Sequence, residues 1–229
     1  MIRNPATLTI EPGTMVRFAV RSDDQHGGGD TPITDPYFPN DPALAPSQIS
    51  AIVVITGSLY AVGSAERPII FTSDSLNPQK ADWQSIAFEK GRLSLTNSIV
   101  EYAYYGIQIN QDADDSTVVI ENNTVRHIQG CGICLAPKPT VRITITISGN
   151  DISDCGHEGI DTHSSANVVI EHNTLHDNLN GIVIDGNNST IRYNRFVRNE
   201  NGIDIVNKDS HPSIYENTFE GNRADIRRP

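Results

Sequence analysis

The sequence predicts an all-β solenoid of stacked parallel β-coils, and two observations lead to that prediction. The first is a Gly-Ile pair that recurs at intervals of 26, 27, 22 and 21 residues, beginning at Gly106, Gly132, Gly159, Gly181 and Gly202. The second is that each repeat carries short runs in which apolar and polar residues alternate, as they do in β-strands. A repeat of this length cannot bury its own apolar face, so neighbouring copies must stack to form a core.

Length and composition fit one elongated domain spanning residues 1–229. The formal net charge of −11 argues against a nucleic-acid partner, because phosphate binding needs a basic face and the chain has no Lys/Arg run. No run of about eighteen apolar residues is present, so the sequence predicts no membrane insertion. Residues 1–10 lack the apolar centre of a signal peptide, which fits either an intracellular protein or one whose export signal has been removed.

The first coil is predicted as a strand over residues 8–10, a turn at Pro12 and Gly13, and a strand over residues 16–20. Residues 22–47 are rich in Pro, Gly and Asp and predict a loop, because proline cannot donate to a strand ladder. The acids of this loop could hold Ca²⁺, but their spacing matches no known calcium loop, and a solvated loop is the favoured interpretation. Strands are expected again over residues 52–55, 57–61, 68–73 and 83–88.

The motifs of these opening coils resemble those of a known group of proteins. Leu-Thr-Ile-Glu-Pro-Gly-Thr at 8–14 is followed by Gly-Ser-Leu-Tyr-Ala at 57–61, Arg-Pro-Ile-Ile-Phe-Thr-Ser at 67–73 and Trp-x-x-Ile-x-Phe at 83–88. This order is similar to that in bacterial and archaeal secreted or surface proteins with a pectin-lyase-like, right-handed parallel β-helix. The resemblance implies a right-handed coil, in agreement with the general handedness of crossovers between parallel strands.

From residue 97 onward the repeat is regular enough to assign inward-facing positions. Residues one and three past each glycine are expected to stack as two ladders, and a third ladder lies on another sheet. The ladders are Ile107, Ile133, Ile160, Ile182, Ile203; then Ile109, Leu135, Thr162, Ile184, Ile205; then Ile120, Ile147, Ile170, Ile191, Ile214.

An asparagine follows each member of the third ladder by three residues, at Asn123, Asn150, Asn173, Asn194 and Asn217. Asparagine tolerates left-handed backbone geometry, and its amide can both donate to and accept from the matching turns above and below. The sequence therefore predicts a structural asparagine ladder at a corner of the solenoid, in preference to a binding site.

The cysteines Cys131, Cys134 and Cys155 are too few for a disulfide framework and are interpreted as thiols. Cys131-Gly-Ile-Cys134 has the spacing of a redox or zinc motif. Residues three apart on a β-strand point to opposite faces, however, so the two sulfurs are not expected to share a metal, and no metal ligand is predicted.

The last coil, residues 214–226, is followed directly by Arg227, Arg228 and Pro229. A solenoid without a cap exposes strand edges, which proteins cover with a helix, a loop or another subunit. We therefore expect a larger parent chain or an oligomer that covers the ends.

Residues two and four past each glycine are expected to form two outward-facing columns. These are Gln108, Cys134, Asp161, Val183, Asp204 and Asn110, Ala136, His163, Asp185, Val206. Adjacent coils lie about 4.8 Å apart, so His163 should stack on Asp185, with Asp161 on the same face. A carboxylate beside an imidazole favours the charged ring and fixes its orientation, as a catalytic acid or base requires. The outward positions of any β-helix are polar, so an ordinary surface is the competing interpretation.

The stretches at 159–164, 173–178 and 181–185 resemble the central coils of mannuronan C5-epimerases and of the wider carbohydrate-binding and sugar-hydrolase β-helix group. In that group an Asp-Pro-His motif followed by an acid lies in the groove. Asp161 and His163 match the motif, with Thr162 in place of the proline and Ser164 in place of the acid. The resemblance implies that His163 exchanges the C5 proton of a uronate while Asp161 and Asp185 orient the ring.

The same resemblance implies a cation that neutralises the substrate carboxylate. The candidate cations are Lys138, Lys208 and His157, and we assign Asp204, Lys208 and His157 to substrate binding. The sequence thus predicts an extracellular or cell-surface β-helix that recognises a polysaccharide, with Asp161, His163 and Asp185 as catalytic residues if it also modifies the polymer. No cofactor is required, although Ca²⁺ is compatible. The alternative is a non-catalytic surface or adhesion solenoid.

Overall fold

The computed structural model describes residues 1–20, 51–110, 114–137, 140–163 and 167–229. The predicted loop at 22–47 and its acids lie outside these residues, as do Lys138 and Ser164. Within the described ranges, no helix is long and apolar enough to cross a membrane.

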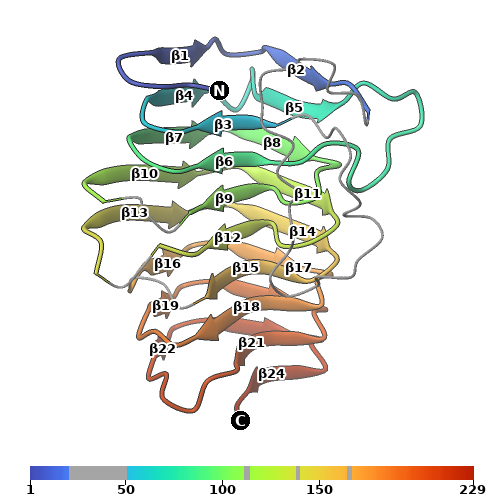
Figure 1. The fold of residues 1–229 in the computed structure, drawn as a ribbon. Helices are drawn as coiled ribbons and strands as arrows, with labels where there is room; N and C mark the ends of the chain where they lie inside the picture. The colour runs from blue at the N-terminus through green and yellow to red at the C-terminus, as the bar shows by residue number, and fades with distance from the viewer. Residues whose placement is uncertain (21–50, 111–113, 138–139, 164–166) are drawn as a thin grey trace.

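The described residues form three parallel sheets of eight strands each, and successive strands of the chain belong to successive sheets (Figure 1). The first sheet contains β1 (Thr7–Ile10), β4 (Ser58–Val62), β7 (Arg92–Thr96), β10 (Ser116–Glu121), β13 (Ile143–Ser148), β16 (Val169–Glu171), β19 (Thr190–Arg192) and β22 (Ser213–Tyr215). The second contains β2 (Met15–Phe18), β5 (Ile69–Ser73), β8 (Ser98–Glu101), β11 (Thr124–Ile128), β14 (Asp151–Cys155), β17 (Thr174–His176), β20 (Arg195–Val197) and β23 (Thr218–Glu220). The third contains β3 (Ile52–Val54), β6 (Ile86–Phe88), β9 (Ile107–Ile109), β12 (Ile133–Leu135), β15 (Glu158–His163), β18 (Asn180–Asp185), β21 (Asn201–Ile205) and β24 (Ala224–Arg227). The predicted all-β parallel solenoid is confirmed.

The inward ladders form the core as predicted. Ile133 pairs with Ile107 on one side and with Ile160 on the other, and the ladder continues in register to Ile182 and Ile203. Every member of the first two ladders is at most 2% exposed. The stacked side chains bury apolar area between consecutive coils, and this burial is the main stabilising contribution.

Each repeat needs its glycine because adjacent coils approach closely at that point. A Cβ on Gly159 would lie 2.7 Å from the carbonyl oxygen of Gly181, and a Cβ on Gly202 would lie 2.6 Å from that of Asp225. Such distances are shorter than real Cβ contacts, so any side chain would push the coils apart. The Gly-Ile pairs that reveal the repeat in the sequence therefore mark close approaches of the backbone.

The predicted asparagine ladder is a continuous hydrogen-bonded stack. The Asn150 Oδ1 atom accepts bonds from the backbone N and the Nδ2 of Asn123, both at 3.0 Å. The Asn173 Oδ1 atom accepts the equivalent bonds from Asn150 at 2.9 Å. Each bond satisfies a buried donor that would otherwise lose its water.

The prediction that these asparagines adopt left-handed backbone geometry is wrong. The left-handed residue is the one before each asparagine, with φ between 54° and 69° at Asn122, Gly149, His172, Tyr193 and Glu216. The chain bends at that preceding residue, and the asparagine side chain then closes the corner. Asparagine is therefore required at this position for its amide group.

A second asparagine ladder lies at the next corner and was not predicted. The Cys155 N–H donates to Asn178 Oδ1 at 3.0 Å, the Asn178 N–H to Asn199 Oδ1 at 3.1 Å, and the Asn199 N–H to Asn222 Oδ1 at 3.0 Å. The ladder position is occupied by Ile128 and Cys155 in the preceding coils. The repeat thus changes its residue type part-way along the solenoid.

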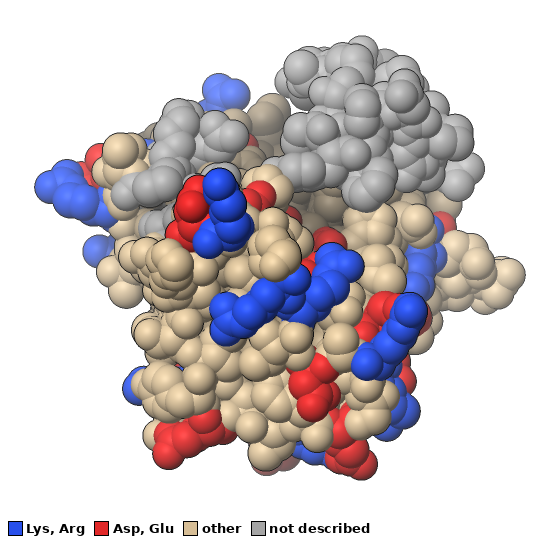
Figure 2. Space-filling view, turned by 90° about the horizontal axis from the view of Figure 1, so that it is seen from below, with Lys and Arg blue, Asp and Glu red and all other residues tan. Residues whose placement is uncertain are grey.

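The C-terminal end of the described solenoid carries charges of both signs. Figure 2 shows Lys/Arg and Asp/Glu side chains close together on that end. Arg223 pairs with Glu200, and Arg227 pairs with Asp204 on β21. Whether a parent chain or a second subunit covers the ends stays a prediction.

Candidate functional site

The predicted group of Asp161, His163 and Asp185 lies together on the third sheet. His163 at the end of β15 pairs in register with Asp185 at the end of β18. The His163 Nε2 atom lies 3.1 Å from Asp185 Oδ2, and the Nδ1 atom lies 3.9 Å from Asp161 Oδ1. The side chains of Asp161, His163 and Asp185 are 14%, 29% and 20% exposed, so the group is half-buried but reachable from solvent.

Two neighbouring residues hold this group in place. Thr162 lies between Asp161 and His163 in the sequence and is buried, and its hydroxyl donates to the Val183 carbonyl oxygen at 2.9 Å. The buried Asn187 donates from Nδ2 to Thr162 Oγ1 at 2.9 Å. The turn after Asp185 requires Gly186, whose φ of 74° is costly for any residue with a Cβ. Asn187 was not predicted, because it lies in the turn after β18, beyond the alternating strand positions that the repeat assigns.

The predicted substrate-binding residues are not gathered around His163. Asp204 is only 1% exposed, and its Oδ1 accepts a hydrogen bond from Arg227 Nε at 2.7 Å. His157 lies just before β15, at the opposite end of that strand from His163. Lys208 is exposed in the turn after β21, at the same end of the sheet as His163. Of the three, only Lys208 lies beyond the same end of the third sheet as His163.

The interpretation of Cys131 and Cys134 as two thiols is wrong. The two residues form a disulfide, with their Cα atoms 5.8 Å apart. Cys131 precedes β12, so its side chain does not follow the alternation of an extended strand. Cys155 is a buried free cysteine, as predicted, and burial raises the pKa of its thiol strongly.

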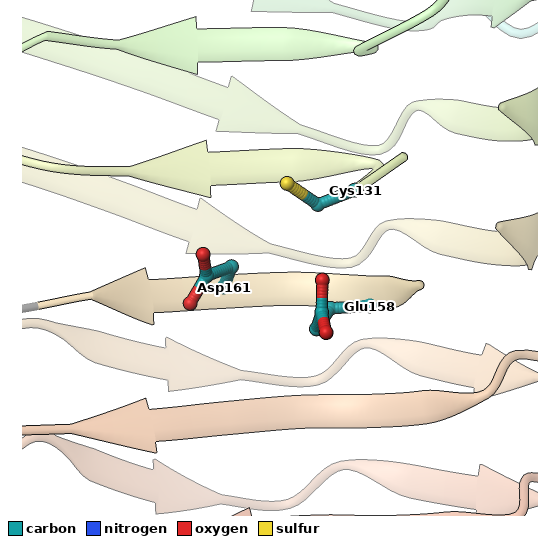
Figure 3. A group of neighbouring side chains, drawn as sticks. All are labelled: Cys131, Glu158 and Asp161. Atoms are coloured by element: carbon teal, nitrogen blue, oxygen red, sulfur yellow. The ribbon is translucent and has the colours of Figure 1, made fainter. Parts of the chain in front are cut away.

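The disulfide lies beside two carboxylates of the next coil. Figure 3 shows the Cys131 sulfur above Glu158 and Asp161, both on β15. Burial is the largest influence on Glu158 and raises the pKa of its carboxyl, although a hydrogen bond from Asn180 favours the charged form. Glu158 was not predicted as a site residue, because it precedes Gly159 and so lies outside the two columns that follow each glycine. The residue before each glycine forms its own outward column, which includes Cys131, Glu158, Asn180 and Asn201.

Comparison with known proteins decides the family. A family model described as a right-handed β-helix region matches residues 84–219, more than half of the chain. The chain belongs to the right-handed β-helix family. No curated protein and no solved structure matches the chain. Membership establishes the predicted fold and handedness and names no substrate.

Two other histidines of this β-helix also lie against carboxylates. His127 Nδ1 lies 2.7 Å from Asp154 Oδ2, and the same carboxylate accepts a bond from Lys80 at 2.7 Å. His176 lies between two carboxylates, with Nδ1 2.7 Å from Asp177 Oδ2 and Nε2 2.9 Å from Asp151 Oδ1, and Asp177 also binds Arg198. Asp154 and Asp177 are each shared with a basic side chain, as in ordinary ion-pair networks between coils. His163 also lies between two carboxylates, but its partners Asp161 and Asp185 are less exposed, at 14% and 20%, than Asp151 and Asp177, at 57% and 43%.

A surface groove of the β-helix lies away from His163. It has a volume of about 470 Å³ and is lined by Leu179, Asn180, Glu200, Asn201, Arg223, Ala224 and Arg227. These residues lie mainly around the starts of β18, β21 and β24, whereas His163 and Asp185 lie at strand ends. The groove therefore does not form the walls of the His163 group.

Proposed function

We propose that this β-helix protein acts outside the cytoplasm, recognises a polysaccharide along the outer face of its third sheet, and exchanges a proton with a uronate through His163. The observation that carries this proposal is the stacking of His163 on Asp185 at 3.1 Å, with Asp161 on the same face. An imidazole oriented by carboxylates and accessible to solvent is the usual form of a general acid or base.

The proposed chemistry assigns one role to each side chain. Asp185 orients the ring through Nε2, and the proton would be exchanged at Nδ1, the nitrogen that lies 3.9 Å from Asp161. Removal of the C5 proton of a uronate leaves negative charge on its carboxylate. Return of a proton to the opposite face of C5 would give an epimer, whereas loss of the C4 substituent would give an unsaturated sugar. Lys208 is the basic residue proposed to approach the substrate carboxylate.

A second candidate function, a non-catalytic scaffold, is favoured by a different observation. Charged side chains of neighbouring coils pair along the outer faces: Arg126 with Glu101, Arg192 with Glu171, Arg198 with Asp177, and Arg195 with Glu220. Pairs of this kind hold coils in register and need no ligand. A spacer or adhesion solenoid would require only these pairs and the core.

Incubation with a panel of uronans separates the two candidates. We expect either ultraviolet absorbance from an unsaturated product or NMR signals from an epimerised sugar. His163→Ala should lower the reaction rate at least about 100-fold, the lower end of the contribution of a general acid or base. The matched control is His211→Ala, because the exposed His211 contacts Asn188 through its backbone N–H. Absence of product with every uronan, or equal rates in His163→Ala and wild type, would leave the scaffold as the better account.

A further inference from the structure

Two consecutive coils of the third sheet carry the same four-residue frame, in which Gly-Ile lies between two chemically reactive residues. Cys131-Gly-Ile-Cys134 is followed one coil later by Glu158-Gly-Ile-Asp161. Ile133 pairs with Ile160 and Cys134 with Asp161, so the two frames are stacked in register. The Cys131 sulfur and one carboxylate oxygen each of Glu158 and Asp161 lie within 4.8 Å of one another (Figure 3).

The disulfide adds a fourth ligand atom to this group. Because Cys134 is bonded to Cys131, both sulfurs lie next to the two carboxylates. A tetrahedral zinc site with Zn–S bonds of about 2.3 Å and Zn–O bonds of about 2.0–2.2 Å separates its ligand atoms by roughly 3.3–3.8 Å. The Cys131 sulfur and the two carboxylate oxygens lie within 4.8 Å of one another, so side-chain rotation is enough to bring them to these separations.

The surroundings favour a bound cation once the sulfurs are reduced. The Cys131 side chain is buried against Ala81, Tyr104 and Tyr105, which cover one side of the group. Two thiolates and two carboxylates in such a partly buried volume repel one another strongly, and a divalent cation would offset that repulsion.

We propose that reduction of the Cys131–Cys134 disulfide creates a site in which both thiolates, Glu158 and Asp161 bind one divalent cation of the zinc type. In the reduction step a small dithiol supplies two electrons and two protons. The S–S bond breaks, two S–H groups form, and the dithiol becomes a cyclic disulfide. Metal binding then displaces the two thiol protons into solvent.

The ligand set selects the class of metal. Sulfur ligands disfavour Ca²⁺ and Mg²⁺, which prefer oxygen ligands, whereas carboxylates disfavour Cu⁺. Zn²⁺ and Co²⁺ accept both kinds of atom in tetrahedral geometry. The site does not depend on the proposed polysaccharide function, although it shares Asp161 with it. The oxidised chain, expected in an oxidising compartment, has no thiolates and would not hold the metal.

Cobalt absorption spectroscopy tests the site directly. The full chain is reduced with a small dithiol, desalted without oxygen and titrated with Co²⁺. We expect one Co²⁺ per chain, with thiolate-to-cobalt absorption in the near ultraviolet and the visible bands of tetrahedral cobalt, and displacement by Zn²⁺. Cys134→Ser, Glu158→Gln and Asp161→Asn should each weaken Co²⁺ binding at least tenfold.

The controls separate this site from adventitious binding. Cys155→Ala removes the remaining cysteine and should leave the cobalt spectrum unchanged, and non-reduced protein should show no sulfur-to-cobalt band. The proposal is overturned if reduced, folded protein, checked by circular dichroism, gives no such band. It is equally overturned if Glu158→Gln and Asp161→Asn both bind Co²⁺ as tightly as wild type, since thiols alone would then account for the binding. Neither readout involves a polysaccharide, so failure here leaves the proposed function untouched.

Discussion

Single side-chain amides stabilise the corners of this solenoid. Asn173 Oδ1 accepts two bonds from Asn150, and Asn173 Nδ2 donates to Asn194 Oδ1 at 3.0 Å. Asn173 is 1% exposed, so water cannot replace these partners. Each buried donor left without an acceptor costs about 1–3 kcal/mol.

Asn173→Ala should therefore lower the free energy of unfolding by roughly 2–3 kcal/mol. Urea denaturation measures this change. The matched control is Asn188→Ala, because Asn188 is exposed and its side chain accepts a hydrogen bond from the His211 backbone N–H at 2.7 Å, which water can replace. Equal losses in the two variants would contradict the structural role of the buried ladder.

The lowered pKa of Asp177 leads to a specific prediction for how stability depends on acid pH. A hydrogen bond from Arg198, and then one from His176, lowers the pKa of Asp177 to about 2 from an ordinary value of 3.8. A carboxyl whose pKa is lower in the folded state stabilises the protein fully above its unfolded pKa. That contribution is lost as the pH falls from about 3.8 through about 2.

Between about pH 3.8 and pH 2, the melting temperature of Asp177→Asn should fall less than that of the wild type. Thermal denaturation at several pH values measures it, and the effect should be modest because the Asp177 side chain is 43% exposed. Asp209→Asn, at an exposed position in the turn after β21, serves as the control. An unchanged acid profile in Asp177→Asn would contradict the assigned pKa.

At the scale of the strand, the Gly-Ile unit determines both register and coil spacing. Gly202 lies where a Cβ would meet the Asp225 carbonyl oxygen at 2.6 Å and the Phe219 ring at 3.0 Å. The backbone oxygen belongs to the next coil and cannot rotate away. A methyl group at this position must therefore separate β21 from β24.

Gly202→Ala should destabilise the protein by roughly 2–3 kcal/mol, in the range of overpacked cores. Val206→Ala is the control on the same coil, because Val206 is 44% exposed and surface changes usually stay within about 0.5 kcal/mol. Denaturation curves of both variants test the claim. A Gly202→Ala variant as stable as Val206→Ala would show that the coils can separate without cost.

The strand-scale predictions succeeded where alternation holds and failed where the chain turns. The ladders through Ile133, Ile160 and Ile182 could be predicted because period-two alternation and the repeat length together specify the register. The Cys131–Cys134 disulfide could not be predicted because Cys131 precedes the strand. The predicted stacking of His163 on Asp185 is observed. The burial of Asp204 was not predicted, because it depends on Arg227, which lies one coil further along.

At the scale of the whole molecule, the sheets carry different chemistry. The second sheet and its corners hold several of the ion pairs between coils, including Arg126 with Glu101 and Arg195 with Glu220. The third sheet holds the His163 group and the stacked Cys-Gly-Ile-Cys and Glu-Gly-Ile-Asp frames. Because each coil contacts mainly its neighbours, the core is compatible with very different outer faces. The proposed function places ligand recognition on the third sheet.

The most direct test of that placement is NMR of the histidine rings during titration with uronan oligosaccharides. The chain has seven histidines, and the His163 signal is assigned by its absence in His163→Ala. We expect the His163 ring signals to shift and saturate, while those of His127 and His176 on other parts of the solenoid stay in place. No shift of His163 with any oligosaccharide, or equal shifts of all histidines, would contradict polysaccharide recognition at this face.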